Sequence, residues 1–232
     1  MHDALLVDDH LASLGAAPAL TAYGPEGRLE VSGRVARQWA QKIGGLLRDE
    51  LDAEPGDSLT IDLPPSWRAP LWTLGALLVG VTPDLTGGGS VPGTTGTVGS
   101  LGVVTHDPTS ALAGGAGVLA LAAPSLAMRW PGDLPSGSLD AAAETLAQPD
   151  ELVLPPSPVE DDPTLARGLD VGRGLAAGAR LARVATGTAE DVPWVLGTWL
   201  ARGSAVLLAP GTHAEEAARL AEVERASLEA AD

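Results

Sequence analysis

The stretch SLTIDLPPSWRAPLWTLGALLVGVTPDL, residues 58–85, decides the fold because it contains a strand, a helix and a second strand in close succession. Residues 58–63 have the pattern of a strand that two prolines end, and residues 81–85 form a second β-prone run. Between them, tryptophan and leucine recur at intervals of three and four, which predicts a helix over residues 67–79. Such a βαβ unit places its two strands parallel and close together in one sheet.

The same alternation recurs further along the chain. Residues 101–105 and 117–121 have the pattern of strands, with a helix expected near residues 109–113. The continuous apolar run at residues 204–209 is typical of a central strand buried on both faces. We therefore expect an α/β fold, in which a twisted and mostly parallel sheet is flanked by helices.

The N-terminal residues predict a helix followed by a hairpin. The helix is expected over residues 3–14, and the β-prone runs at 20–23 and 28–31 are joined by Gly-Pro-Glu-Gly, which favours a tight turn. Ser32 is expected to cap a further helix that runs to about residue 51.

The C-terminal half is expected to be mainly helical around the strand at 204–209. Helices are predicted over residues 139–147, 165–186 and 188–201. Pro193 should lie in the first turn of the last of these, where its missing N–H is harmless. Thr212 and Glu215 have the spacing of a capping box and should open the final helix.

Charge and composition exclude several classes of function. The 232 residues include 14 basic and 30 acidic side chains, for a net charge of −16, so nucleic acid and anionic membranes would be repelled. The absence of cysteine excludes disulfides, zinc–thiolate sites, iron–sulfur clusters and cysteine catalysis. The apolar fraction of 45% is typical of a globular protein.

Two stretches of unusual composition bear on membrane insertion and on domain organisation. One carries no charge, and the other is rich in proline. The uncharged stretch at residues 109–128 contains proline and glycine, so we interpret it as a buried helix and strand and not a membrane span. The proline-rich acidic segment at 149–163 is interpreted as an exposed crossing segment within one domain over residues 1–232. The N-terminus lacks the basic start of a signal peptide, so a cytoplasmic location is expected.

Framework positions in this order resemble the N-terminal part of AMP-binding, adenylate-forming enzymes, the superfamily of the acyl-CoA synthetases. More narrowly, the chain is similar to a short actinobacterial family of uncharacterised proteins related to the front half of these enzymes. The matching stretches are Leu20-Thr-Ala-Tyr23, Leu29-Glu-Val-Ser32, Gly45-Leu-Leu47, Pro55-Gly-Asp57, Leu59-Thr-Ile-Asp-Leu63, Leu74-Gly-Ala-Leu-Leu-Val-Gly80 and residues 196–210.

The resemblance implies the fold of the N-terminal subdomain, and it also implies that the ATP-binding lysines and the lid domain of these enzymes are missing. Enzymes of this superfamily hold ATP with a lysine-bearing phosphate loop, an adenine motif and a lysine on a C-terminal lid domain. Fixed cations are needed because adenylation redistributes negative charge on a triphosphate. Lys42 is the only lysine here and lies in an early predicted helix, so it matches neither lysine by position, and the chain is expected to be a truncated relative without the lid domain.

Residues 92–99, PGTTGTVG, come close to the phosphate loop of that superfamily but carry no lysine. Backbone N–H groups of such a loop can hold phosphate, and an ordinary loop is the alternative interpretation. The candidate contacts for residual phosphate binding are Gly93, Thr94, Thr95 and Gly96. His106 and Asp107 are further candidates, because they follow a predicted strand at the edge where α/β sheets bind ligands.

Other tempting patterns are given structural interpretations. Tyr23-Gly-Pro-Glu26 resembles part of an adenine-binding motif by coincidence, and Gly172, Gly174 and Gly178 are interpreted as small residues for close helix packing and not a dinucleotide fingerprint. Asp8-Asp9-His10 is interpreted as a solvated helix end and not a metal site. Asp161-Asp162 is interpreted as a solvated part of the crossing segment.

Three functions remain open on the sequence. The first is a degenerate, non-catalytic protein that acts as an interaction or regulatory scaffold, with a protein partner or a second copy and no cofactor. The second is a module that retains binding of ATP, AMP or an acyl-type small molecule. The third is half of a synthetase that a second chain completes.

Overall fold

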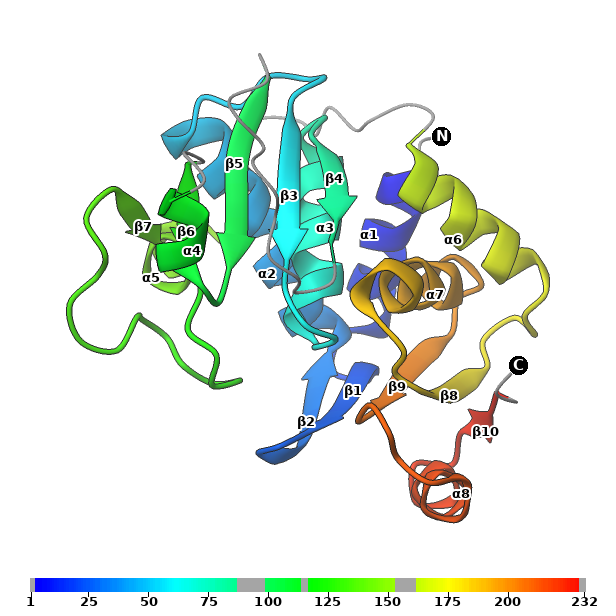
Figure 1. Cartoon of the computed structure of the whole chain (residues 1–232). Helices are drawn as coiled ribbons and strands as arrows, with labels where there is room; N and C mark the ends of the chain where they lie inside the picture. Colours follow the sequence, from blue (N-terminus) through cyan, green and yellow to red (C-terminus); the bar gives the residue numbers. More distant parts are fainter. Residues whose placement is uncertain (1–2, 87–98, 114–116, 153–161, 230–232) are drawn as a thin grey trace. The chain divides into compact units, whose positions relative to one another are not determined.

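The computed structural model describes residues 3–86, 99–113, 117–152 and 162–229 and has α/β architecture (Figure 1). Two compact units are present, each described below by itself. The first unit comprises Met1–Arg37, Pro65–Pro70 and Asp161–Asp232, and the second comprises Gln38–Pro64 and Leu71–Glu160. The expected α/β class with mostly parallel strands is confirmed, and the strands are divided between two sheets.

The second unit is built on an all-parallel sheet. Among the described residues its strand order is β4-β3-β5-β6-β7, and Figure 1 shows the arrows of β3, β4 and β5 pointing the same way. The strands are β3 (Ser58–Asp62), β4 (Thr82–Leu85), β5 (Ser100–Thr105), β6 (Val118–Ala120) and β7 (Ser138–Asp140). Both predicted βαβ units are confirmed, with α3 (Arg68–Leu78) and α4 (Pro108–Ala113) as their crossover helices.

The core of this unit follows the predicted apolar pattern. Leu59 and Ile61 of β3, Val104 of β5, and Leu74 and Leu78 of α3 are fully buried. Burial of each such side chain contributes on the order of 1.5–3 kcal/mol, so the strand–helix–strand stretch at 58–85 supplies a large share of the stabilisation.

The first unit contains a sheet of mixed direction. Among the described residues its order is β10-β8-β9-β1-β2, in which β1 and β2 form the predicted antiparallel hairpin and the other pairs are parallel. The strands are β1 (Pro18–Gly24), β2 (Gly27–Ser32), β8 (Arg180–Val184), β9 (Ser204–Leu208) and β10 (Ser227–Leu228). The apolar run at 204–209 is confirmed as a central strand, with Ala205, Val206 and Leu208 fully buried.

The remaining helices agree largely with the sequence pattern. They are α1 (Asp3–Leu14), α2 (Gly33–Gly45), the short π-helix η1 (Leu46–Glu50), α5 (Ala141–Ala147), α6 (Pro163–Arg173), α7 (Thr188–Leu200) and α8 (Ala214–Val223). The Ser32 hydroxyl accepts a hydrogen bond from Val35 N at 3.3 Å, which confirms the predicted N-cap of α2.

One prediction fails because a strand replaces helix. Residues 165–186 were expected to be largely helical, but α6 ends at Arg173 and residues 180–184 form β8. Helical propensity is overridden there because the backbone of β8 pairs with β9 along its whole length, from Arg180↔Ser204 to Val184↔Leu208.

A similar but smaller correction applies to residues 139–147. The first two residues of that range belong to β7, which pairs with β6, and only residues 141–147 are helical. Asp140 then caps α5, because its Oδ1 accepts hydrogen bonds from Ala142 N and Ala143 N, each at 3.2 Å.

Two helix starts also differ from expectation. Since α7 begins at Thr188, Pro193 lies inside the helix and not in its first turn. The capping box is wrong as well, because the N-cap of α8 is His213 without a side-chain cap, and the Thr212 hydroxyl donates instead to Ala209 O at 2.7 Å.

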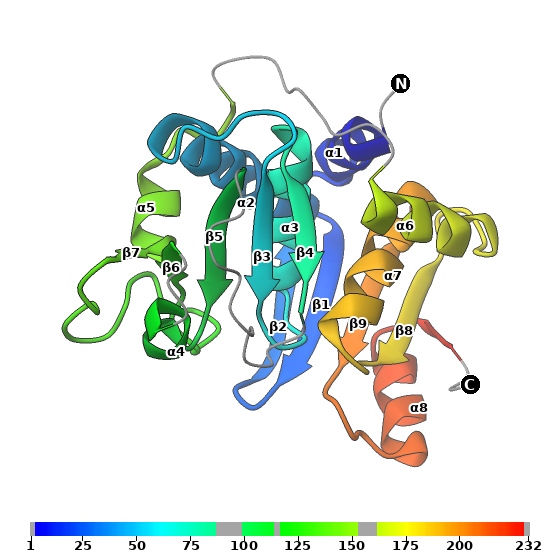
Figure 2. The ribbon, with the colours of Figure 1, turned by 45° about the horizontal axis from the view of Figure 1, so that its top comes forward.

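The packing of α6 on α7, visible in Figure 2, depends on small residues. A Cβ atom at Gly172 would lie 2.9 Å from Gly197 O, and one at Gly168 would lie 3.2 Å from Pro193 O. The interpretation as a helix-packing residue is therefore confirmed for Gly172 and is wrong for Gly178, which has open space where a Cβ atom would lie. Residues 109–128 contain α4 and β6, and among the described residues no helix combines the length and the apolar character that a membrane crossing requires.

Candidate functional site

The parallel strands of the second unit end in a cluster of polar side chains. Asp62 is the last residue of β3, Thr105 is the last of β5, and Thr86 follows β4. The Thr86 hydroxyl donates to Asp62 Oδ1 at 3.1 Å, and the Thr105 hydroxyl donates to Asp62 Oδ2 at 2.9 Å. Because the three strands are parallel, their carboxyl ends meet at one edge, which is where open α/β sheets bind ligands.

The two predicted strand-end residues lie at this same edge. Asp107 N donates to the Thr105 hydroxyl at 3.0 Å, and Asp107 Oδ1 accepts from Ser110 N at 3.1 Å. His106 is half-buried, whereas Asp107 is exposed. Both residues directly follow β5, as the sequence predicts, while ligand binding by His106 and Asp107 stays a prediction. Asp62 and Thr86 were not singled out from the sequence.

The residues Gly93, Thr94, Thr95 and Gly96 lie outside the described residues, so their candidate role in phosphate binding stays a prediction. Among the described residues, the carboxyl ends of β3 and β5 carry the carboxylates of Asp62 and Asp107. Such an edge offers acceptors to hydrogen-bond donors and repels a polyphosphate.

The ammonium group of Lys42 makes polar contacts within the second unit. Its Nζ donates to Gln148 O, lies 3.4 Å from Leu146 O and forms an ion pair with Asp150 Oδ1 at 3.0 Å, and the side chain is 14% exposed. A cation at these carbonyls satisfies the C-terminal end of α5 and interacts favourably with its dipole.

We expect Lys42→Met to lower the free energy of unfolding by about 1–2 kcal/mol, because the carbonyl oxygens at the end of α5 lose their charged donor. Chemical denaturation measures this change. Gln38→Met is the matched control, since Gln38 makes an exposed contact with the same Asp150, and it should change stability by less than about 0.5 kcal/mol. If Gln38→Met lowers the free energy of unfolding as much as Lys42→Met does, the stabilising role of the Lys42 ammonium group at the end of α5 would be contradicted.

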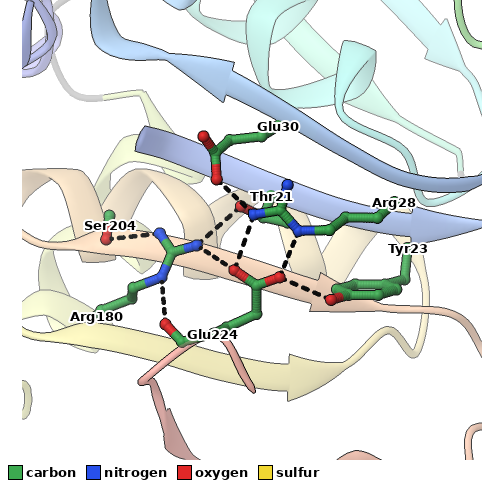
Figure 3. Close-up of polar contacts among 7 residues, drawn as sticks. All are labelled: Thr21, Tyr23, Arg28, Glu30, Arg180, Ser204 and Glu224. Carbon is green, nitrogen blue, oxygen red and sulfur yellow. Dashed lines mark hydrogen bonds and ion pairs between the residues drawn. The ribbon is translucent and has the colours of Figure 1, made fainter. Parts of the chain in front are cut away.

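A second polar cluster, in the first unit, surrounds Glu224 and was not expected from the sequence (Figure 3). Glu224 Oε1 accepts from Tyr23 Oη and from Arg28 Nε, each at 2.6 Å, and Oε2 accepts from Arg180 Nη2 at 2.8 Å. These bonds, above all the one from Arg28, lower the pKa of Glu224 to about 2. Tyr23 thus has a structural partner, which agrees with a coincidental match to the adenine motif.

The interpretation of Asp8-Asp9-His10 as a solvated helix end is wrong for Asp8 and His10, whereas Asp9 is exposed. Asp8 and His10 are 7% and 3% exposed, and Asp8 Oδ2 accepts from Arg37 Nε at 3.0 Å. His10 Nε2 donates to Gly203 O at 2.8 Å, which ties α1 to the turn before β9. Burial, aided by the positive charge of Arg202, lowers the pKa of His10.

We expect this histidine to make stability depend on pH. Because its pKa is lower in the folded chain than in the unfolded chain, the neutral form favours folding, and this contribution is lost as pH falls below about 6.5. His10→Gln should lower the free energy of unfolding by about 1–2 kcal/mol at pH 7.5 and show a shallower decline toward pH 5.5. Urea titrations at both pH values measure these free energies of unfolding. His213→Gln serves as the control, because His213 is exposed.

The carboxylate of Asp162 also differs from expectation. It is 2% exposed and caps α6, accepting from Thr164 N at 2.8 Å and Leu165 N at 3.0 Å, so the interpretation of a solvated pair is wrong for this residue. Burial raises its pKa. Asp161 lies outside the described residues. In the part of the chain that the structure describes, no group of histidine and acidic side chains could hold a metal ion.

Several solved structures with a similar fold are synthetases. An acyl-CoA synthetase from Brucella canis matches with a TM-score of 0.77 and 19% identity, covering 98% of this chain and 47% of that one. An acetoacetyl-CoA synthetase from Streptomyces lividans matches with a TM-score of 0.72 and 20% identity, covering 97% of this chain and 41% of that one. The amide bond synthetase McbA from Marinactinospora thermotolerans matches with a TM-score of 0.64 and 17% identity, covering 97% of this chain and 48% of that one.

These similarities show a shared fold with the N-terminal part of acyl-CoA synthetases and other adenylate-forming enzymes. The chain spans less than half of the length of each of these synthetases. No protein-family model matches the sequence, and no curated protein is similar to it in sequence.

Proposed function

We propose that this chain is a non-catalytic protein with an adenylate-forming-enzyme fold, acting as an interaction or regulatory scaffold. The observation that carries the proposal is the position of Lys42, the single lysine, whose ammonium group is bound to the end of α5 and to Asp150. Adenylation needs cations placed against a triphosphate, and a lysine engaged in this way does not supply one.

The strand-end cluster supports the same proposal. A triphosphate placed at the carboxyl edge of β3 and β5 would face Asp62 and Asp107, and electrostatic repulsion would weaken its binding. The glycine- and threonine-rich segment 92–99 adds no side-chain charge to offset this repulsion.

Pyrophosphate exchange tests catalysis directly. The purified chain, with Mg²⁺, ATP and a panel of fatty, aromatic and amino acids, should exchange labelled pyrophosphate into ATP no faster than a protein-free sample. Exchange that depends on one carboxylic acid and disappears in Lys42→Met, at a temperature where that variant is folded, would overturn the proposal. Lys42→Arg keeps the structural charge and serves as the folded control.

The strand-end cluster favours a second candidate, a binding module for a small molecule. The hydroxyl of Thr105 and the carboxylates of Asp62 and Asp107 offer acceptors that match a ligand rich in hydrogen-bond donors, such as the hydroxyl groups of a ribose. Titration with AMP, observed by chemical-shift changes of Thr105 and Asp107, tests this candidate. Shifts that Asp62→Asn abolishes would support it, and unchanged spectra at millimolar AMP would exclude it.

A further inference from the structure

The C-terminal part of the first unit, α8 and β10, is attached to its sheet by few apolar groups. Of the helix, Ala217 and Ala221 are buried and pack with Val206 and Leu208, and Leu220 is only partly buried against the same cluster. An alanine methyl group removes little apolar area from water when it is buried. β10 adds just two paired residues, Ser227↔Leu181 and Leu228↔Ala182 among the described residues. Apolar packing alone therefore holds this segment weakly.

A single carboxylate supplies most of the polar attachment. Glu224 is the C-cap of α8, and its side chain is 4% exposed. It accepts hydrogen bonds from Tyr23 on β1, Arg28 on β2 and Arg180 on β8, and its backbone oxygen accepts from Arg180 Nε at 2.9 Å (Figure 3). Hydrogen bonds to charged groups are stronger than those between neutral groups, so this carboxylate contributes more to the attachment than the alanine methyl groups of the helix.

The donors are held in place by contacts that do not involve Glu224. Arg180 Nη2 donates to the Thr21 hydroxyl at 2.9 Å and Nη1 to the Ser204 hydroxyl at 3.2 Å, so this guanidinium spans three adjacent strands. Arg28 Nη2 donates to Glu30 Oε2 at 2.5 Å. We call Tyr23, Arg28 and Arg180 the carboxylate socket. With two guanidinium groups and one retained carboxylate, Glu30, it would carry a net positive charge without Glu224.

A left-handed residue follows Glu224 and ends α8. Arg225 has a φ of +51°, in the left-handed region, and Ala226 N donates to Ala221 O at 2.8 Å to reverse the chain toward β10. This local hydrogen bond closes the end of α8 and links the helix directly to β10.

We propose that α8 and β10 form a latch, held closed on the sheet by Glu224 in the carboxylate socket. The latch opens as one unit while β8, β9 and β1 stay paired, because the hydrogen bonds among those strands do not involve it. Opening uncovers the apolar sheet face that carries Ala182, Val206 and Leu208.

Hydrogen–deuterium exchange of the full chain tests the latch. In Glu224→Gln, amides of residues 214–229 should exchange about 10–100-fold faster than in the parent chain, while those of β9 and β1 should change less than about threefold. Glu222→Gln, two positions earlier on the same helix and exposed, should change neither. Acceleration of β9 equal to that of α8, or no acceleration in α8, would overturn the proposal.

The socket is tested separately with acetate. In Glu224→Ala, sodium acetate should raise the unfolding midpoint above that in sodium chloride of equal ionic strength, without restoring protection of α8, because free acetate is not tethered to the helix. Equal midpoints in the two salts would contradict a preformed socket. If Glu224→Ala fails to fold, native-state exchange of the parent chain decides: the proposal requires α8 and β10 amides to share one opening free energy below that of β9.

Discussion

Gly102→Ala should be among the most destabilising substitutions in the second unit, lowering the free energy of unfolding by roughly 3–5 kcal/mol. Gly102 lies within β5 at a φ of +121°, which a residue with a side chain rarely adopts. A Cβ atom there would lie 2.2 Å from Gly117 O, a backbone atom of the segment that leads into β6. Relief of that clash requires β5 and β6 to separate, which would disturb Thr105 at the strand-end cluster. Urea denaturation measures the loss.

The same unit offers a matched control for backbone strain. Gly56 has a φ of +101° and open space where a Cβ would be, so Gly56→Ala suffers only the conformational cost, about 1–2 kcal/mol. A loss in Gly102→Ala no greater than that in Gly56→Ala would show that the close approach of β5 to Gly117 is not what makes alanine unacceptable.

Trp199→Ala should have the largest effect in the first unit, about 4 kcal/mol. The indole is fully buried on α7, and its Nε1 donates to Ala19 O on β1 at 3.0 Å, so one side chain fills the core and satisfies a strand carbonyl. Removing it leaves a cavity and an unpaired buried acceptor at the same place. Denaturation monitored by far-ultraviolet circular dichroism measures the change.

Phenylalanine substitutions separate the hydrogen bond from the packing. Trp194 lies on the same helix and is 1% exposed, and its Nε1 makes no hydrogen bond with any described residue. Trp199→Phe should therefore cost about 1 kcal/mol more than Trp194→Phe, the contribution of the bond to Ala19 O. Equal losses would show that this bond adds nothing to the attachment of α7.

Much of the fold could be predicted because its signals are local. The strands and helix of residues 58–85 are each defined by an apolar pattern and ended by proline or glycine, and the structure reproduces them as β3, α3 and β4. The right-handed crossover rule then makes the strands parallel without further information. The hairpin of β1 and β2 is equally local, because its turn residues lie between two short strands.

β8 could not be predicted in the same way. Its sequence, RLARV, contains good helix formers and lacks a strict alternation, so local propensity favours helix. It is a strand because β9, more than twenty residues later, offers a backbone partner along its whole length. The strand conformation of β8 therefore depends on its pairing with β9 and could not be inferred from the residues of β8 alone.

The polar clusters show the same difference between contacts that local sequence predicts and contacts that only the folded chain brings together. His106 and Asp107 could be placed at a sheet edge because they follow a strand directly. Asp62 could not be linked to Thr86 and Thr105, nor Glu224 to Tyr23, because these pairs are brought together by strand order across 24 to 201 residues of chain. His10 was misplaced for a similar reason, since its partner, Gly203 O, is 193 residues away.

Calorimetric titration of the full chain with Mg²⁺ and ATP tests most directly the central claim, that the chain lacks the triphosphate site on which catalysis would depend. The retention of Lys42 in a structural contact and the carboxylates at the strand ends predict no saturable heat up to millimolar nucleotide. A one-to-one isotherm with a Kd below about 100 μM, equivalent to about −5.5 kcal/mol, would contradict the account, because it would require a triphosphate site that the described residues do not supply.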